Sequence, residues 1–261
     1  MALLKVDKVT HFFGGLRAVY NFSLTLRGGE LMGLIGPNGA GKTTAFNLIS
    51  GFYKPSEGDI WFEGKNISGL RPHKVTGLGM ARTFQNIRLW NSLTVFDNLC
   101  ISQHDHLGYG FLQSVLRTPQ FRRSEQKVKT TAEEIMDLLG IRHFALEFPK
   151  NLPYGLQRRV EIGRALCLRP KLLLLDEPAA GMNPGEVEQL IDLIRWIRDE
   201  FKLTILLIEH HMRVVMGVCD RMKVIDFGET IAEGTPDEIK KNPRVIQAYL
   251  GEEEPAHARG I

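Results

Sequence analysis

The stretch from Gly36 to Thr43 has the residue types and the spacing needed to hold a chain of phosphates. Its letters, GPNGAGKT, fit the pattern G-x-x-x-x-G-K-[ST] between an apolar run and a helical segment. Glycines let successive backbone N–H groups point at an anion, and the following helix presents its positive N-terminal end. Lys42 would reach the β- and γ-phosphates, and the Thr43 hydroxyl would ligate Mg²⁺. The residues predicted to contact a nucleotide are Gly36, Pro37, Asn38, Gly39, Ala40, Gly41, Lys42, Thr43 and Thr44.

Two adjacent carboxylates, Asp176 and Glu177, follow the four leucines Leu172–Leu175. An acidic residue at the end of a buried strand can hold Mg²⁺ through the water shell of the ion. A second carboxylate beside it can activate a water molecule for attack on a γ-phosphate. Without a phosphate loop, such a pair would more often cap the next helix. After a phosphate loop, we assign Asp176 to the metal and Glu177 to the general base.

Three short apolar runs predict strands that are covered on both faces, namely Leu31–Ile35, Leu172–Leu175 and Thr204–Ile208. Each run is followed by polar residues or glycine and then by a helical pattern. This alternation is typical of an α/β domain with a mostly parallel sheet. The phosphate loop and the Asp-Glu pair each stand directly after one of these runs.

The helix after the second run begins with clear signals. Asn183 is a candidate N-cap, Pro184 suits the first helical position, and Glu186 completes an arrangement like a capping box. Apolar residues then recur at helical spacing. The predicted buried face consists of Val187, Leu190, Ile191, Ile194 and Ile197.

The flanking segments differ in pattern from this core. Leu3–Leu26 and Asp59–Phe62 predict short strands of a small antiparallel sheet. The stretch from about Leu89 to Gly163 is mostly helical in pattern, and it includes a flexible-looking piece, Gly108–Arg123. A basic cluster overlaps that piece, and we interpret it as a solvated face. The cluster contains Arg117, Arg122, Arg123, Lys127 and Lys129 against the single acid Glu125.

The composition excludes several classes of protein. The chain has 261 residues, 43% of them hydrophobic and 24% charged, which excludes a mostly disordered chain. A net charge of +3 is too small to indicate a nucleic-acid partner. Three widely spaced cysteines argue against a disulfide framework or a zinc site. Since no run approaches the ~20 apolar residues of a spanning helix, we expect a soluble, intracellular protein.

With these motifs in place, the chain resembles the ATP-binding subunit of ABC transporters. The resemblance runs nearly from end to end. It implies that Gln85 is the Q-loop glutamine, which senses Mg²⁺ and the attacking water, and that His210 is the switch histidine at the γ-phosphate. Phe13 is placed like the aromatic residue that stacks on adenine, with Phe12 as the alternative. The expected cofactors are ATP and Mg²⁺.

Several stretches are similar to the branched-chain amino-acid subgroup of this family. They are Gly51–Pro55, Ala81–Gln85, Thr118–Arg123, Ala179–Pro184, Leu207–His210 and Asn242–Gly251.

The family signature L-S-G-G-Q is altered in this chain, where it begins at Leu152. Pro153 has neither a hydroxyl nor an N–H to offer, and Leu156 replaces the glutamine. Gly155 remains, and the resemblance implies that it contacts the ATP of an opposite subunit. Asn183 stands where many relatives carry an aspartate. We therefore expect this chain to work beside a different cassette chain with a better signature, with a second copy of itself as the alternative.

The resemblance also implies a fold and a set of partners. The expected fold is an α/β P-loop NTPase cassette with a parallel core sheet, an N-terminal antiparallel β subdomain and a helical subdomain. Residues 1–261 would form one ATP-binding domain, with the helical subdomain inserted at about residues 89–163. The partners would be two integral-membrane permease subunits, a second ATPase subunit and a periplasmic or extracellular solute-binding protein, with no nucleic acid. The chain would lie peripherally on the cytoplasmic face of the inner membrane.

Within this resemblance, residues Asn86–Leu99 would dock a cytoplasmic helix of the permease. The apolar side chains available for that surface are Ile87, Leu89, Trp90, Leu93, Val95 and Phe96, and each could equally belong to the core. The resemblance implies an ATPase that energises an importer of branched-chain amino acids, with a related transporter of urea, other amino acids or lipopolysaccharide as the alternative. A soluble ABC-type ATPase of DNA repair or translation fits poorly, because there is one phosphate loop and no long insertion. A P-loop kinase would leave His210 unexplained.

Overall fold

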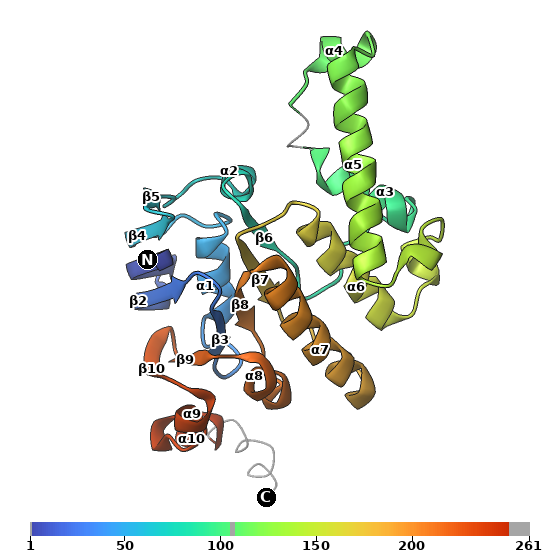
Figure 1. Ribbon diagram of the computed structural model, residues 1–261. Coiled ribbons are helices and arrows are strands. Elements are labelled where there is room, and N and C mark those ends of the chain that lie inside the picture. Colours follow the sequence, from blue (N-terminus) through green and yellow to red (C-terminus); the bar gives the residue numbers. More distant parts are fainter. Residues whose placement is uncertain (1, 105–107, 251–261) are drawn as a thin grey trace, which may run out of the picture.

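The computed structural model describes residues 2–104 and 108–250, so that Gly251, the last residue of the Asn242–Gly251 stretch, lies outside the described residues. The larger of its two sheets, called the core sheet below, has the strand order β10-β9-β3-β8-β7-β6 (Figure 1). Strands β9, β3, β8, β7 and β6 are parallel, and β10 pairs antiparallel with β9. The strands are β3 (Leu31–Ile35), β6 (Met80–Arg82), β7 (Leu172–Asp176), β8 (Thr204–Ile208), β9 (Arg221–Asp226) and β10 (Glu229–Gly234).

The three predicted core strands are confirmed as β3, β7 and β8. All residues of the three strands are buried. Their side chains divide between two cores: Leu173 and Leu175 pack among helices, whereas Leu172 and Leu174 face the antiparallel sheet and α1. Because successive side chains of a strand point to opposite faces, a strand between two cores is apolar along most of its length, as these three are apart from Thr204 and Asp176 at strand ends.

A second sheet, of antiparallel strands, covers one side of the core sheet, as the sequence predicted. It comprises β1 (Ala2–Phe13), β2 (Leu16–Arg27), β4 (Glu57–Phe62) and β5 (Lys65–Asn66) in the order β2-β1-β4-β5. Strands β1 and β2 have 12 residues each, so they are longer than the short strands expected. The tight turn at Gly14, in the left-handed region with a φ of 57°, joins them.

The helices lie on both sides of the core sheet. Helix α1 packs with the antiparallel sheet, whereas residues of α3, α5, α6, α7 and α8 belong to the other core. None of the helices in the described part of the chain has the length and apolar character that a bilayer crossing requires. The helices are α1 (Lys42–Ile49), α2 (Pro72–Gly77), α3 (Val95–Ser102), α4 (Phe111–Val115), α5 (Pro119–Leu138), α6 (Tyr154–Leu166), α7 (Pro184–Phe201), α8 (Met212–Val218), α9 (Pro236–Lys240) and α10 (Pro243–Leu250), with short 3₁₀ turns at Arg142–Phe144 and Pro149–Asn151.

The predicted start of α7 is confirmed in detail. The Asn183 side chain accepts hydrogen bonds from the backbone N–H groups of Gly185 and Glu186, and the Glu186 side chain accepts one from the Asn183 N–H. These reciprocal bonds satisfy donors that a helix start otherwise leaves unpaired. The five predicted apolar residues are all buried. Helix α7 is thus fixed directly after the Asp-Glu pair.

The predicted helical stretch contains α3, α4, α5 and α6. Within the piece Gly108–Arg123, which the sequence marks as flexible-looking, the structure places α4 and the first turns of α5. The Thr118 side chain accepts a hydrogen bond from the Phe121 N–H, and Pro119 is the first residue of α5. A threonine N-cap followed by proline is a helix-start signal. The piece therefore carried a start signal that the sequence interpretation overlooked.

Candidate functional site

The phosphate loop joins β3 to α1 through backbone positions that only glycine fits. A Cβ atom on Gly36 would lie 2.0 Å from the Ile225 carbonyl oxygen, and one on Gly41 would lie 2.5 Å from that of Ala18. Gly41 also has a φ of 100°. Lys42 is 5% exposed, and its Nζ donates to the carbonyl oxygens of Gly36 and Pro37 at 2.7 Å each. The start of the loop is therefore bonded to the ammonium group of Lys42 at its end.

The predicted metal ligand Asp176 lies at the carboxyl end of β7, where it is 4% exposed. Arg82, at the end of the neighbouring strand β6, donates from Nη2 to Asp176 Oδ2 at 2.7 Å. Its Nη1 donates to Asn47 Oδ1 and Ser50 Oγ of the α1 region at 2.7 and 2.8 Å. Arg82 thus ties Asp176 to the helix that begins at the phosphate loop. The sequence reasoning did not single out Arg82, although a charged residue at the end of a short apolar strand was the available signal.

The structure brings three predicted residues together at one carboxylate. Gln85 Nε2 donates to Glu177 Oε2 at 2.7 Å, and His210 Nδ1 lies 3.5 Å from the same oxygen. The Glu177 backbone has a φ of 45°, and its N–H donates to the Ile208 carbonyl at 2.9 Å. A glutamate in this left-handed region is strained. The hydrogen bonds hold the carboxylate at the end of β7 against this strain, with the side chain 14% exposed.

A second carboxylate, Glu209, directly precedes His210, and sequence reasoning did not assign it a role. Its side chain is fully buried. It accepts hydrogen bonds from the backbone N–H groups of Ala179 at 2.8 Å and of His210 and His211 at 3.0 Å each. Glu209 therefore joins the turn after Glu177 to the segment that carries His210. Its place directly after a wholly apolar strand was the signal that could have identified it.

The loop around Gln85 is held from the other side by α6. Arg158 is 1% exposed, and its two Nη atoms donate to the carbonyl oxygens of Phe84 and Gln85 at 2.8 and 2.9 Å. Arg158 also pairs with Glu161 at 2.6 Å, and Glu161 Oε1 accepts from the Phe84 N–H at 3.2 Å. Burial raises the pKa of Glu161, against the lowering effect of Arg158. Helix α6, which begins at the altered signature, therefore holds the backbone of Phe84 and Gln85 through Arg158 and Glu161.

Gly155 and Phe13 lie apart from the group at Glu177. Gly155 is in the first turn of α6, and a Cβ there would lie 3.3 Å from Glu186 Oε1 of α7. Phe13 lies at the end of β1, 43% exposed, with its ring edge-on to the rings of His11 and Tyr53 at 4.7 and 5.2 Å. Phe12 is similarly exposed, at 41%. Phe12 and Phe13 are thus almost equally accessible to a nucleotide base.

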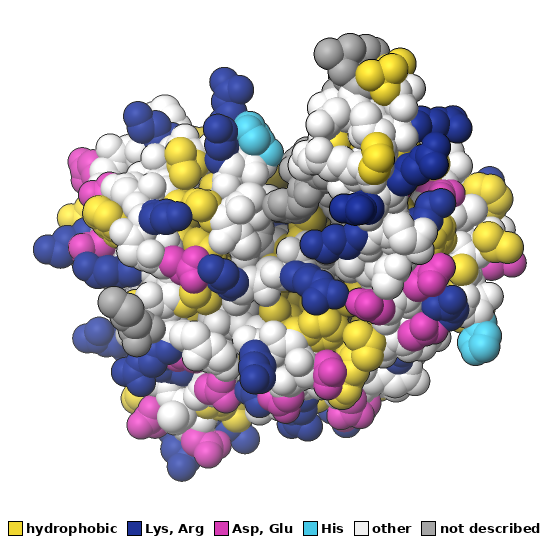
Figure 2. Space-filling view, turned by 45° about the horizontal axis from the view of Figure 1, so that its top comes forward, with side chains coloured by type: hydrophobic (Ala, Val, Ile, Leu, Met, Phe, Trp, Pro, Cys, Tyr) yellow, Lys and Arg dark blue, Asp and Glu magenta, His cyan; other side chains and the backbone are white. Residues whose placement is uncertain are grey.

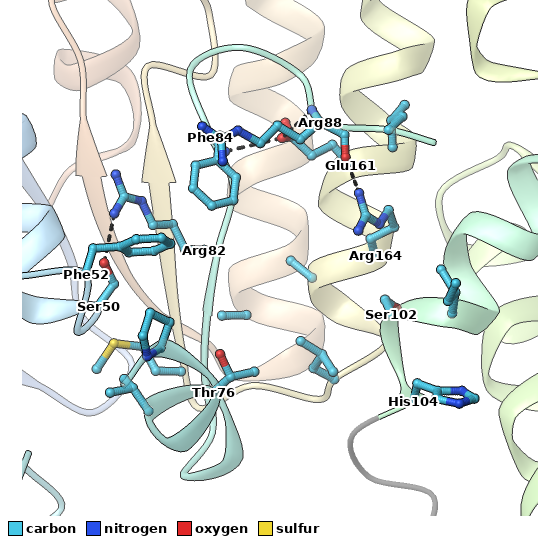
Figure 3. Close-up of a pocket in the computed structure, with 18 of the residues that line it drawn as sticks. Ser50, Phe52, Thr76, Arg82, Phe84, Arg88, Ser102, His104, Glu161 and Arg164 are labelled. Carbon is cyan, nitrogen blue, oxygen red and sulfur yellow. Dashed lines mark hydrogen bonds between the residues drawn. The ribbon is translucent and has the colours of Figure 1, made fainter. Parts of the chain in front are cut away.

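A cleft of about 600 Å³ opens between the core sheet and the helical segment. Residues from both sides line this cleft. Figure 3 shows Ser50, Phe52 and Thr76 across from Ser102, His104 and Arg164. Arg164 spans part of it, since its guanidinium lies 4.4 Å from the Trp90 ring centre and donates to the Arg88 carbonyl. Phe84, which directly precedes Gln85, also lines the cleft. The cleft therefore reaches the same loop that contacts Glu177.

The apolar residues expected on a docking surface divide between this cleft and the core. Leu89 and Trp90 line the cleft, and Trp90 is 45% exposed. Val95 is wholly buried and belongs to the core, the second of the two readings that the sequence left open, because it begins α3 and packs among the helices. Phe96 packs against the same core.

Sequence patterns of known families match most of the chain. The family described as ABC transporter matches residues 19–180, and that of the branched-chain amino acid ATP-binding cassette transporter matches residues 229–255. The chain is 47% identical, over 250 residues, to the high-affinity branched-chain amino acid transport ATP-binding protein LivG of Salmonella typhimurium. It is 46% identical to the corresponding BraF protein of Pseudomonas aeruginosa. Each match covers 96% of this chain and 98% of the relative.

Solved structures agree with these matches. A crystal structure of an ATP-binding cassette of an ABC transporter, in its ADP conformation, is similar with a TM-score of 0.84 and 31% identity. The match covers 96% of this chain and 99% of the other. A nucleotide-free cassette matches with a TM-score of 0.82 and 32% identity. The phosphate loop, the cluster at Glu177 and these likenesses together establish that the chain belongs to the ATP-binding cassette family, the ATPases of ABC transporters.

Proposed function

We propose that this chain binds and hydrolyses ATP to drive an importer of branched-chain amino acids. One observation carries the catalytic part of the proposal. The Glu177 carboxylate is held by Gln85 and lies beside His210 at the strand end that also bears Asp176. A carboxylate fixed in this way, next to a phosphate loop, suits the activation of water for phosphoryl transfer.

The phosphate loop fits a polyphosphate, because glycine positions keep its backbone clear of side chains and Lys42 supplies a buried positive charge. We assign nucleotide contacts to Gly36, Lys42 and their neighbours through Thr44. Mg²⁺ would be held by the Thr43 hydroxyl, Asp176 and the Gln85 side chain, which are the oxygen ligands that this ion prefers. When bound, the ion would neutralise charge on the β- and γ-phosphates.

In hydrolysis, Glu177 takes a proton from water as the water oxygen bonds to the γ-phosphorus and the bond to the β–γ bridging oxygen breaks. Gln85 keeps the carboxylate aimed at that water, and His210 would contact the γ-phosphate. Because Arg158 and Glu161 grip the backbone next to Gln85, a shift of α6 would move the glutamine as well. The site is therefore mechanically linked to the helical segment.

The cleft between the core sheet and the helices is the proposed docking place for a cytoplasmic helix of the permease. It presents Phe52, Leu89 and Trp90, and it is also lined by Phe84, next to Gln85. A partner helix seated there would act on the loop that holds Glu177. This chain would then lie peripherally on the cytoplasmic side of the membrane, with a solute-binding protein on the other side.

For the second ATPase subunit, we propose a different chain. Gly155 would contact the nucleotide of that subunit, but Pro153 beside it lacks an N–H. The site completed by Gly155 should therefore be the slower one. Full activity of this chain reconstituted with the permease alone would refute the pairing with a different chain.

The proposed catalysis is tested with Glu177→Gln in the assembled transporter. We expect nucleotide binding to persist and steady-state hydrolysis to fall by about 10²–10⁴-fold, the usual contribution of a positioned base. Glu200→Gln, at an exposed position of α7, is the matched control and should change neither quantity. Unchanged hydrolysis in Glu177→Gln would remove Glu177 from the role of base.

The transport part is tested separately. Trp90→Ala should reduce co-purification with the permease, whereas Trp61→Ala, at a position 37% exposed on the antiparallel sheet, should not. ATP-dependent uptake of leucine into vesicles, with urea as the comparison, tests the solute. Uptake of urea without uptake of leucine would refute the assignment to branched-chain amino acids.

A further inference from the structure

The segment from residue 108 to residue 129, called the arm below, projects from the helical part of the molecule (Figure 1). It comprises α4 and the first half of α5. The buried residues of α5 all lie toward its C-terminal end, from Val128 to Met136. Within the arm, α5 is supported from one side, where Tyr109 packs its ring against Phe121 at 4.9 Å. Most of the other arm residues whose burial the structure describes are exposed or half-buried.

The open surface of the arm is strongly basic. All five of its cations are exposed: Arg117, Arg122, Arg123, Lys127 and Lys129. At about 100° per residue, Arg123 lies opposite Phe121 and Val128, and Arg122, Lys127 and Lys129 lie on the flanks of the same helix. Within the described residues, none of the five forms an ion pair of 4 Å or less. The single acid of the arm, Glu125, accepts a hydrogen bond from the Tyr109 hydroxyl at 2.6 Å on the supported side.

Exposed apolar side chains lie next to these charges. Val115, the last residue of α4, and Leu116, which follows it, are 62% and 74% exposed. They directly precede Arg117 in the chain. A basic surface with apolar residues at its margin is the pattern of segments that bind at a membrane interface, where cations meet lipid phosphates and apolar groups enter the acyl boundary.

The position of the arm matches such a role. On the other side of the cleft, α2 carries the exposed residues Arg71, His73 and Lys74. Figure 2 shows Lys and Arg side chains on both sides of the hollow between the α2 region and the arm. If the permease docks in this cleft, the basic residues at α2 and those of the arm both face the membrane that holds the permease. This orientation rests on the proposed function.

We propose that the arm binds the anionic head groups of phospholipids in the leaflet around the permease. The lipid phosphates would neutralise the unpaired cations of α5, and Val115 and Leu116 would lie at the interface. Lipid contact would hold the helical segment, and with it the loop that α6 grips through Arg158, at a fixed distance from the membrane.

The test uses the full chain and vesicles of phosphatidylcholine with or without phosphatidylglycerol. The arm variant is Arg122→Gln/Arg123→Gln/Lys127→Gln. The control variant, Lys240→Gln/Lys241→Gln/Arg244→Gln, removes three exposed cations near α9 and α10, at the opposite end of the molecule (Figure 1). Both variants change only exposed side chains, and both have the same net charge. Co-sedimentation at physiological ionic strength measures the affinity.

We expect the wild-type chain and the control to bind only vesicles with phosphatidylglycerol, and less tightly at high salt. The arm variant should bind at least tenfold more weakly, since each cation near an anionic surface is worth about a fivefold factor in affinity. Equal binding by the two variants, or no binding by the wild-type chain, would overturn the proposal. Weaker co-purification of the arm variant with the permease in lipid-free detergent would overturn it too, because the arm would then contact protein. The vesicle assay needs neither hydrolysis nor permease, so its failure is distinct from failure of the Glu177 and Trp90 tests.

Discussion

Replacing Glu209 by glutamine should both destabilise the fold and slow ATP hydrolysis, although the substitution preserves shape. The Glu209 side chain is fully buried, and its hydrogen bonds reach the turn after Glu177 and the segment of His210. One of its oxygens accepts from the Ala179 N–H, and the other accepts from the N–H groups of His210 and His211. A glutamine has a single acceptor oxygen, so it cannot satisfy both sides.

The size of the effect follows from these three bonds. In the best orientation the glutamine oxygen keeps the two histidine N–H groups, and its NH₂ group faces the Ala179 N–H. One buried donor left unpaired costs about 1–3 kcal/mol, and the two remaining bonds lose the strengthening that a charged acceptor gives. A total of roughly 3 kcal/mol corresponds to a fall in Tm of about 6–12 °C for a chain of this size.

The catalytic effect arises because Glu209 joins the turn after Glu177 to the backbone of His210. A shift of about 1 Å in a catalytic group can lower the rate by as much as ~10²-fold, so we expect kcat to fall by about 10–100-fold. Nucleotide affinity should change less than kcat, since the three backbone groups that bond to Glu209 belong to Ala179, His210 and His211 and not to the phosphate loop.

Urea unfolding and steady-state hydrolysis in the assembled transporter measure the two effects. Glu209→Asp, which keeps the charge on a shorter side chain, should recover part of both losses. An unchanged urea midpoint together with an unchanged kcat would refute the whole argument. Lower stability with normal kcat would show that Glu209 supports the fold but does not position His210.

Three further outcomes are expected. Lys42→Ala should abolish ATP binding, measured by equilibrium titration with a fluorescent analogue, because it removes the buried charge of the phosphate loop. Arg82→Met should lower the free energy of unfolding by about 3–5 kcal/mol, because it leaves Asp176 without its buried partner; an unchanged urea midpoint would refute this. Burial raises the pKa of Cys100 to about 11 and of Cys167 to about 12 from 9.0, so native-state alkylation at pH 8 should be about 100-fold slower at Cys100 and about 1000-fold slower at Cys167 than in urea. Alkylation of the native protein at the unfolded rate would contradict the raised pKa values. Since the folded thiols keep protons that the unfolded chain releases above about pH 9, the free energy of unfolding should also fall as the pH rises from 9 through 11.

The amino-acid sequence alone determined the elements that depend on local pattern. The phosphate loop was identifiable because its glycines and Lys42 must stand at fixed spacing around an anion. The strands β3, β7 and β8 were identifiable because a strand between two cores is apolar along most of its length. The capped start of α7 was equally local, since Asn183 and Glu186 are three residues apart.

The tertiary structure alone decided which distant residues support the catalytic group. Arg82 meets Asp176 across 94 residues of sequence, and Arg158 meets the Gln85 backbone across 73. No spacing rule links such pairs, because their contact depends on the order of strands in the sheet and on how α6 packs against the loop. Glu209 is adjacent to His210 in sequence, yet its role depends on Ala179, which the pairing of β7 with β8 brings close. Sequence patterns record spacing along one element, whereas these side chains act through hydrogen bonds between elements that only folding brings into contact.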